Sequence, residues 1–239
     1  MSFPLLKQTF KSNFAVWGLV TLVMNVILAQ LIAMKQTQAL VAPMYYGMLV
    51  STMVALLVVI TGNKLLAGQV DQGSMAYILT APIRRTTVAI TQLVYMVGSL
   101  VVTYGAMVAV SLVTNNIADA GFKTQTLINL NFGAFMVALA FAGIMFAASG
   151  IFNLSKYAFG TGGLLIILFI LLAIVGSFAD YGVAGLEHVQ HLTIVSLFDY
   201  KNIVSAGSKW LPKLAALGGI AAATFGIGTT AFAKKDLPL

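Results

Sequence analysis

The fold is decided by a run without any charged residue, which reads YAFGTGGLLIILFILLAIVGSFA from residue 157 to residue 179. About 20 helical residues, rising about 1.5 Å each, cross a hydrocarbon core of about 30 Å. Five more charge-free windows occupy 12–34, 36–63, 86–118, 124–155 and 214–233. Each window is long enough to cross once and too short to cross twice. We therefore expect an all-α integral membrane protein, a single transmembrane domain over 1–239, with six transmembrane helices at 14–34, 43–61, 87–113, 131–152, 160–178 and 214–232.

The composition agrees with this interpretation. Of 239 residues, 60% are hydrophobic and 8% are charged, whereas a soluble domain has about 45–50% apolar and about 25% charged residues. An ordinary soluble globule, a disordered chain and a collagen-like fibre are excluded. The chain has no cysteine, which excludes disulfides, thiolate chemistry and cysteine metal sites.

The positions of the charges predict the orientation. With the N-terminus inside, the cytoplasmic segments have a net charge of +6 and the outer segments +1. Cytoplasmic loops of membrane proteins carry the excess of lysine and arginine, so we predict that both termini are cytoplasmic. The chain's net charge of +7 then reflects topology and contact with a lipid membrane, and no nucleic-acid partner is expected.

Two segments outside the spans have an amphipathic pattern. Near the N-terminus, apolar residues recur every three or four positions, at Phe3, Leu6, Phe10, Phe14 and Trp17. Two lysines, Lys7 and Lys11, occupy another face. We expect an interfacial helix that bends into the first span. The alternative is that these residues are the water-exposed end of that span, with lysine side chains that snorkel to the interface. Residues 180–213 mix apolar and charged positions, and we expect one or two short helices against the outer membrane surface there, with a re-entrant course left open.

The sequence lacks the combinations of residues that catalysis or metal binding requires, so no catalytic or metal-binding residue is assigned. The two histidines, His188 and His191, lie in the outer segment, so Ser149 in the fourth span has no histidine base within the membrane. No P-loop sequence is present, so the chain is not expected to bind ATP in that way. No acidic residue falls within a predicted span, which disfavours coupling to protons or sodium ions.

The inner segment 64–85 is charged too heavily to lie in the bilayer but keeps an apolar face. Gly73 can end one short helix, Ser74 can cap the next and Pro82 can stop it. We predict a broken helix on the cytoplasmic surface, with an apolar face for the membrane or a partner. An amphipathic connector without a partner is the alternative.

Residues 68–85, GQVDQGSMAYILTAPIRR, resemble the segment after the second span of ABC type-2 exporter permeases. That family has an acidic, glycine-bearing helix followed by Leu-x-x-Pro and a basic residue, and often a glutamate where this chain has Gln69. The ending FAKKD, at 232–236, resembles the family's aromatic and basic tail. Matching positions in this chain are Asp71, Gly73, Ser74, Leu79, Pro82 and Arg84.

The resemblance implies a permease subunit of an ATP-driven exporter in a bacterial plasma membrane, working by alternating access. A separate ABC ATP-binding subunit would hold ATP and Mg²⁺, and this chain would bind no cofactor. A second permease copy or a relative would form a dimer with it. Residues 69–79 would be the coupling helix. The residues implied to couple with the ATPase are Gln69, Asp71, Gly73, Ser74, Leu79, Pro82, Arg84 and Arg85.

Polar residues form one stripe along the third span, at Gln92, Tyr95, Ser99 and Thr103. Thr21 and Asn25 share a face of the first span and extend this surface. A polar stripe facing lipid is costly, so it either lines a substrate pathway or makes hydrogen bonds between helices. Because the stripe is uncharged, a pathway there would suit amphiphilic or apolar cargo such as a drug, a peptide or a lipid.

Small residues recur every four positions on the sixth span, as Ala215, Gly219 and Ala223 and as Gly218, Ala222 and Gly226. Such ridges allow helices to approach closely, either within this chain or between subunits. For the function, two alternatives stay open beside the exporter: a gradient-driven carrier or channel, and an accessory or immunity protein of the membrane that does not transport.

Overall fold

The computed structural model describes residues 1–75, 84–178, 186 and 189–235, and these residues form helices and connecting turns. Among the described residues, six helical segments are long and apolar enough to span a membrane, as the six predicted spans require. Most extend past the predicted limits, because the helices continue into the flanking polar residues. They are α1 (Phe3–Ala33), the run η1 (Gln38–Leu40), η2 (Val41–Leu49) and α2 (Val50–Leu65), α5 (Arg85–Ile117), α6 (Thr124–Ile151), the run α7 (Ser155–Ala158), η3 (Phe159–Gly163) and α8 (Leu164–Ser177), and α10 (Trp210–Lys234).

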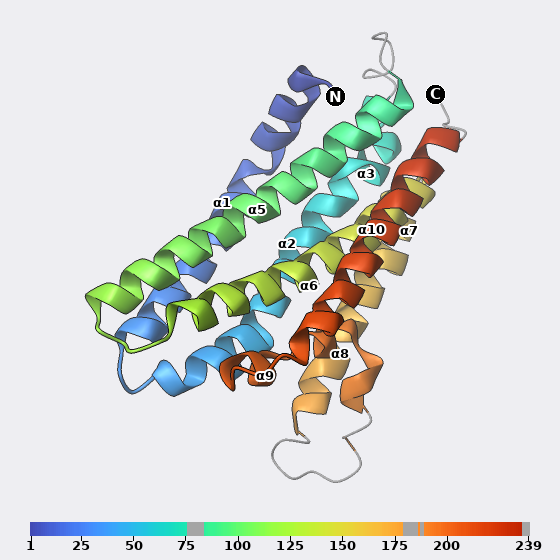
Figure 1. Cartoon of the computed structure of the whole chain (residues 1–239). Coiled ribbons are helices and arrows are strands. Elements are labelled where there is room, and N and C mark those ends of the chain that lie inside the picture. Colours follow the sequence, from blue (N-terminus) through green and yellow to red (C-terminus); the bar gives the residue numbers. More distant parts are fainter. Residues whose placement is uncertain (76–83, 179–185, 187–188, 236–239) are drawn as a thin grey trace.

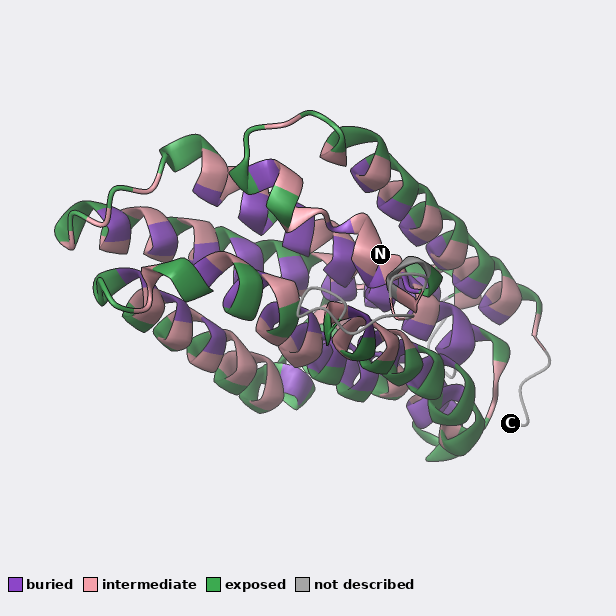
Figure 2. Cartoon of the chain, turned by 90° about the horizontal axis from the view of Figure 1, so that it is seen from below, coloured by how far each residue is buried: buried purple, intermediate pink, exposed green. Residues whose placement is uncertain are grey.

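The outward faces of these helices are apolar. Leu19 and Leu22 of α1 are 64% and 62% exposed, and Leu171 of α8 is 54% exposed. Figure 2 shows buried residues on the faces between helices and exposed residues around the outside. Monomeric soluble proteins rarely present such large apolar surfaces to water. Six apolar helices with apolar outer faces indicate a multi-pass membrane protein.

The start of α1 and the end of α10 lie at one end of the helical bundle, which we call the terminal end (Figure 1). Helix α1 and helix α5 run side by side from this end to the opposite, far end. Helix α6 is central, and its Val137, Phe141 and Phe146 are completely buried. Helix α10 returns along α6 to the terminal end.

Helix α1 is one continuous helix of 31 residues. Residues 3–17 and the first predicted span are therefore parts of one helix. At about 1.5 Å per residue the helix is about 46 Å long, which exceeds a hydrocarbon core of about 30 Å and matches a bilayer with its headgroups.

Glycines let α6 and α10 approach closely. A Cβ atom on Gly150 would lie 2.4 Å from the carbonyl oxygen of Gly228, and one on Gly143 would lie 2.1 Å from the Thr224 hydroxyl. Most of the small residues predicted to form ridges on α10 do not take part in this contact with α6. Gly218 approaches Met136, whereas Gly219 and Gly226 have no described atom within 4 Å of a Cβ position.

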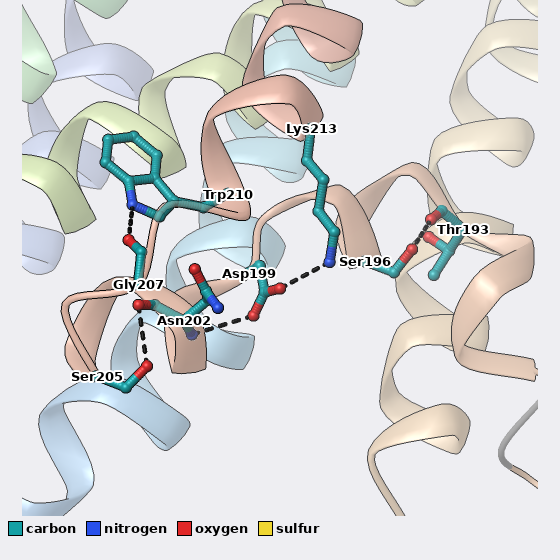
Figure 3. A network of polar contacts seen from close by, with 8 residues as sticks. All are labelled: Thr193, Ser196, Asp199, Asn202, Ser205, Gly207, Trp210 and Lys213. Atoms are coloured by element: carbon teal, nitrogen blue, oxygen red, sulfur yellow. Dashed lines mark hydrogen bonds and ion pairs between the residues drawn. The ribbon is translucent and has the colours of Figure 1, made fainter.

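Between the fifth and sixth spans, the described part of the segment contains three short helices, where one or two were expected: η5 (Val189–Leu192), η6 (Ile194–Leu197) and α9 (Tyr200–Val204). They pack on the far end of the bundle through buried Val195, Phe198 and Ile203. Lys213 of α10 pairs with Asp199 at 2.6 Å, and Asp199 accepts a hydrogen bond from the Asn202 amide at 3.1 Å (Figure 3). His188 lies outside the described residues.

Candidate functional site

The predicted inner segment lies at the terminal end and contains the short helix α3 (Ala67–Asp71). The chain turns after α3 at Gly73, whose φ of 71° is in the left-handed region that favours glycine. It is helical again at Ser74, so the predicted break at Gly73 is confirmed. The implied coupling segment 69–79 is therefore not one continuous helix. Leu79 and Pro82 lie outside the described residues.

Helix α3 and the end of α2 are tied to the corner between α6 and α7 by three hydrogen bonds, two from α3 and one from α2. The Ser149 hydroxyl accepts from the Ala67 amide at 2.9 Å, and the Asn63 side-chain amide donates to the Ser155 hydroxyl at 2.6 Å. The Asp71 carboxylate accepts from the Ser155 amide at 3.2 Å. We call these five residues the α3–α7 junction. Two chain corners far apart in the sequence are thereby held together.

The α3–α7 junction has an anchored side and an open side. Leu65, Leu66 and Met75 are fully buried beneath it. The outer side is formed by four exposed residues, Asp71, Gln72, Gly73 and Ser74, and all of these except Gln72 are implied coupling residues. A partner could therefore contact this segment while its apolar side chains stay packed in the bundle.

A second polar contact joins three helix ends nearby. The Arg85 guanidinium, at the first residue of α5, donates to the carbonyl oxygen of Lys235, which directly follows α10. The Lys235 amine donates to the carbonyl oxygen of Gly150 in α6 at 3.3 Å. Burial disfavours the charged amine and lowers the pKa of Lys235 to about 8. Arg84, which directly precedes α5, is exposed.

A polar cavity of about 390 Å³ lies between the start of α1 and the α2–α3 corner. Two of the implied coupling residues, Gln69 and Ser74, line it. Lys64 is the one charged residue among those that form its wall, which are Gln8, Thr9, Ser12, Asn13, Lys64, Gly68, Gln69, Gln72 and Ser74. Sequence reasoning missed this cavity, because the contribution of α1 depends on how two distant segments pack.

The polar stripe of the third span faces α1. The Thr9 hydroxyl donates to the Gln92 side-chain oxygen at 3.1 Å. The Trp17 indole donates to the Thr103 hydroxyl at 3.0 Å, and the Thr103 and Thr21 hydroxyls are 2.9 Å apart. These contacts form a polar α1–α5 seam, which favours the interhelical alternative for these residues.

The other residues of the predicted polar surface are Tyr95, Ser99 and Asn25. Tyr95 is buried, with 5% of its surface exposed. The Ser99 hydroxyl donates to the Met96 carbonyl within α5, and the Ser99 carbonyl accepts from Trp17 at 3.2 Å. Asn25 donates to the Thr21 carbonyl within α1. Nothing in the sequence indicated that Trp17 would contact α5, because its spacing with the phenylalanines suggested a membrane contact.

Among the described residues, no three histidine or acidic side chains gather in a way that could hold a metal ion. Comparison with known proteins adds no assignment. No family model matches the chain, and no curated protein matches it.

Proposed function

We propose that this chain is the membrane-spanning permease subunit of an ATP-driven ABC exporter, as its resemblance to ABC type-2 permeases implies. The observation that supports this most is the α3–α7 junction. It presents exposed residues on one side, and hydrogen bonds of Ser149, Ser155 and Asp71 fasten it to two spans on the other. A surface of this kind suits a partner that has to move the helices mechanically.

In the proposed mechanism, a separate ATPase subunit binds ATP and Mg²⁺ and pushes on the segment around Gln72 and Gly73. The bond from Ala67 to Ser149 passes this displacement to α6, and the bond from Ser155 to Asp71 passes it to α7. Arg85 and Lys235 extend the link to α5 and α10. Small shifts at such a contact become helix movements because packed helices move as units.

The cargo path is proposed to lie between two permease copies, or between this chain and a relative. The seam residues Gln92 and Thr103 are already bonded to α1, so they offer less to a cargo inside a single copy. We keep amphiphilic or apolar molecules, such as drugs, peptides or lipids, as the cargo class.

The proposed location is a bacterial plasma membrane with both termini in the cytoplasm. Several cations lie at the terminal end, including Lys7, Lys64 and Arg85. The positive-inside rule assigns such an end to the cytoplasm. This orientation would expose the α3–α7 junction to the compartment that supplies ATP.

Purification of the tagged chain from its native membrane tests the proposal. We expect an ATP-hydrolysing chain to co-purify, and we expect Asp71→Lys and Gly73→Val to weaken that association. Asp119→Asn is the matched control, because Asp119 is also exposed but follows α5 at the far end.

The proposal fails if no ATPase co-purifies, or if the Asp71 and Gly73 variants retain it as fully as the control does. Transport by the purified chain alone under an ion gradient would identify a carrier or channel. Binding of cargo without transport, in the presence of the ATPase, would identify an accessory protein.

A further inference from the structure

We propose that the polar cavity between α1 and α3 binds a phosphate ester that carries free hydroxyl groups. The headgroup of phosphatidylglycerol has this chemistry, and so does soluble glycerol phosphate. This inference goes beyond the exporter proposal and does not depend on it, since the site is formed by this chain alone.

The positive charge at the cavity favours an anionic ligand. Lys64 is the one charged residue among the described residues that line the cavity, is exposed, and has no ion-pair partner in the part of the chain that the structure describes. The nearby carboxylate of Asp71 does not line the cavity and accepts from Ser155 instead. A ligand with a single negative charge would leave the site neutral. A phosphate diester carries that charge, a phosphate monoester carries up to one more, and both accept hydrogen bonds from an ammonium group.

Two residues of the cavity wall have a buried side-chain oxygen without a hydrogen-bond donor. Asn13 is only 2% exposed and lines the cavity; its side-chain nitrogen donates to the Thr9 carbonyl at 3.0 Å, while its side-chain oxygen is buried without a partner. The side-chain oxygen of Gln69 is also buried and unpaired. A buried acceptor without a donor is costly. Both oxygens are closed off from the cavity, so each side chain has to turn toward it before a ligand hydroxyl can donate to the oxygen.

Hydroxyl groups fit this wall better than an amine does. An ammonium group would place a second cation in a cavity that already holds Lys64 and that has no carboxylate among its described lining residues. Hydroxyl groups can donate to Asn13 and Gln69 and can also accept from neighbouring amides and hydroxyls. The site therefore distinguishes a glycerol headgroup from an ethanolamine headgroup.

The surroundings place the cavity where lipid headgroups lie. Phe10, Phe14 and Trp17 lie two to five residues from Ser12 along α1, and their aromatic rings contact one another, with centroids 5.4 to 5.9 Å apart. Phe10 and Phe14 are 44% and 53% exposed. Aromatic side chains concentrate at the membrane–water interface. Acyl chains could then extend along the exposed apolar face of α1 at Leu19 and Leu22.

The volume also suits the proposed ligand. At about 390 Å³, the cavity falls within the range of about 300–1,000 Å³ that is usual for small-molecule sites. A glycerol phosphate group fits inside it, whereas the acyl chains of a lipid have to remain outside.

Native mass spectrometry of the purified full chain tests the site. The chain is incubated with equal amounts of phosphatidylglycerol, phosphatidylethanol and phosphatidylcholine. Phosphatidylethanol has the same charge as phosphatidylglycerol but no headgroup hydroxyls. We expect phosphatidylglycerol to be retained most, and we expect Lys64→Gln to reduce its retention roughly tenfold, the effect of losing one charged hydrogen bond.

Matched variants separate the site from general lipid attraction. Ser12→Leu should block the cavity, whereas Lys11→Gln and Ala15→Leu should leave retention within about twofold of the unchanged chain. Ser12, Lys11 and Ala15 are all exposed on α1, but only Ser12 lines the cavity. Soluble glycerol phosphate could instead raise the thermal stability of the chain, with no such effect in Lys64→Gln. If no lipid is then retained selectively, the site binds a free phosphate ester.

Three outcomes overturn the proposal. Equal retention of phosphatidylglycerol and phosphatidylcholine, without stabilisation by glycerol phosphate, would exclude an anion site. Equal effects of Lys64→Gln and Lys11→Gln would show general attraction to basic residues. Equal retention of phosphatidylethanol and phosphatidylglycerol would remove the role assigned to the hydroxyl groups.

Discussion

At the scale of single residues, Thr103 has the most direct role in joining two spans. Its hydroxyl accepts a hydrogen bond from Trp17 and lies 2.9 Å from the Thr21 hydroxyl. The spacing of polar residues on the third span predicted that this face would be turned away from lipid. The identity of its neighbour could not be predicted, because a helix sequence determines which residues share a face but not which helix packs against that face.

Replacing Thr103 with valine tests the seam. The change keeps the shape of the side chain but removes the acceptor of Trp17, so we expect the free energy of unfolding to fall by about 1 kcal/mol. The fluorescence of Trp17, measured in a Trp210→Phe background, should shift as the indole loses this partner. Thr230→Val is the control, because the Thr230 hydroxyl bonds only within α10.

The seam would not be the main role of Thr103 if this variant impaired transport while stability and Trp17 fluorescence stayed the same. That pattern would favour the pathway interpretation of Gln92, Ser99 and Thr103.

Gly150 gives a prediction about close helix packing. A methyl group there would lie 2.4 Å from a backbone oxygen of α10, and backbone cannot move aside as a flexible side chain can. We expect Gly150→Ala to lower the free energy of unfolding by about 1–3 kcal/mol, measured by denaturation in detergent. Gly219→Ala on the exposed face of α10 should cause no loss, since alanine is the better helix former. Equal stability of the two variants would contradict the α6–α10 contact.

At the scale of elements, the short helix α9 is held to α10 by the ion pair of Asp199 and Lys213. Burial acts to raise the pKa of Asp199, but the hydrogen bonds from Lys213 and from the Asn202 amide, together with nearby positive charge, lower the pKa below its ordinary value. The charged form is therefore favoured in the folded protein. Its stabilising effect is present above the unfolded pKa, near 3.8, and is lost as the pH falls through the folded pKa.

We therefore expect α9 to loosen in acid, below about pH 4. Hydrogen exchange at the Asn202 amide, which donates to Asp199, should become faster than its intrinsic pH dependence explains. Asp199→Asn should show fast exchange at neutral pH as well. Unchanged protection of this amide between neutral and acidic pH would contradict the prediction.

The inner segment is a second case at this scale. Its break was predictable because glycine accepts the left-handed conformation found at Gly73. Its attachment through Asn63, Ser149 and Ser155 was not, because small polar residues are common in membrane helices and their partners depend on tertiary packing. Ser149, for which the sequence offers no histidine base within the membrane, accepts a hydrogen bond from the Ala67 amide in the structure.

At the scale of the whole molecule, the two ends of the bundle are predicted to face different compartments. The chain has no natural cysteine, so single cysteines can report on each end. Gln72 is exposed near the terminal end and Asn116 is exposed at the far end of α5. On intact cells, a membrane-impermeant maleimide should label Asn116→Cys but should label Gln72→Cys only after permeabilisation. Labelling of both from one side would contradict a membrane-spanning bundle, and the reverse pattern would contradict the orientation.

The sequence by itself determined the number of spans and their approximate positions. Charges are costly in hydrocarbon, so the uncharged windows had to be the helices that cross. It also indicated which residues of the third span share a polar face, and where the inner segment breaks.

Only the tertiary structure decided which helices pair and what the polar residues contact. Lipid-facing and protein-facing surfaces of a membrane helix are both apolar, so hydrophobic periodicity does not reveal how a helix is rotated. The seam of α1 with α5, the glycine contact at Gly150 and the cavity beside Lys64 each require two segments far apart in the chain. Their positions follow from close packing and hydrogen bonding between helices, which act only after the spans have come together.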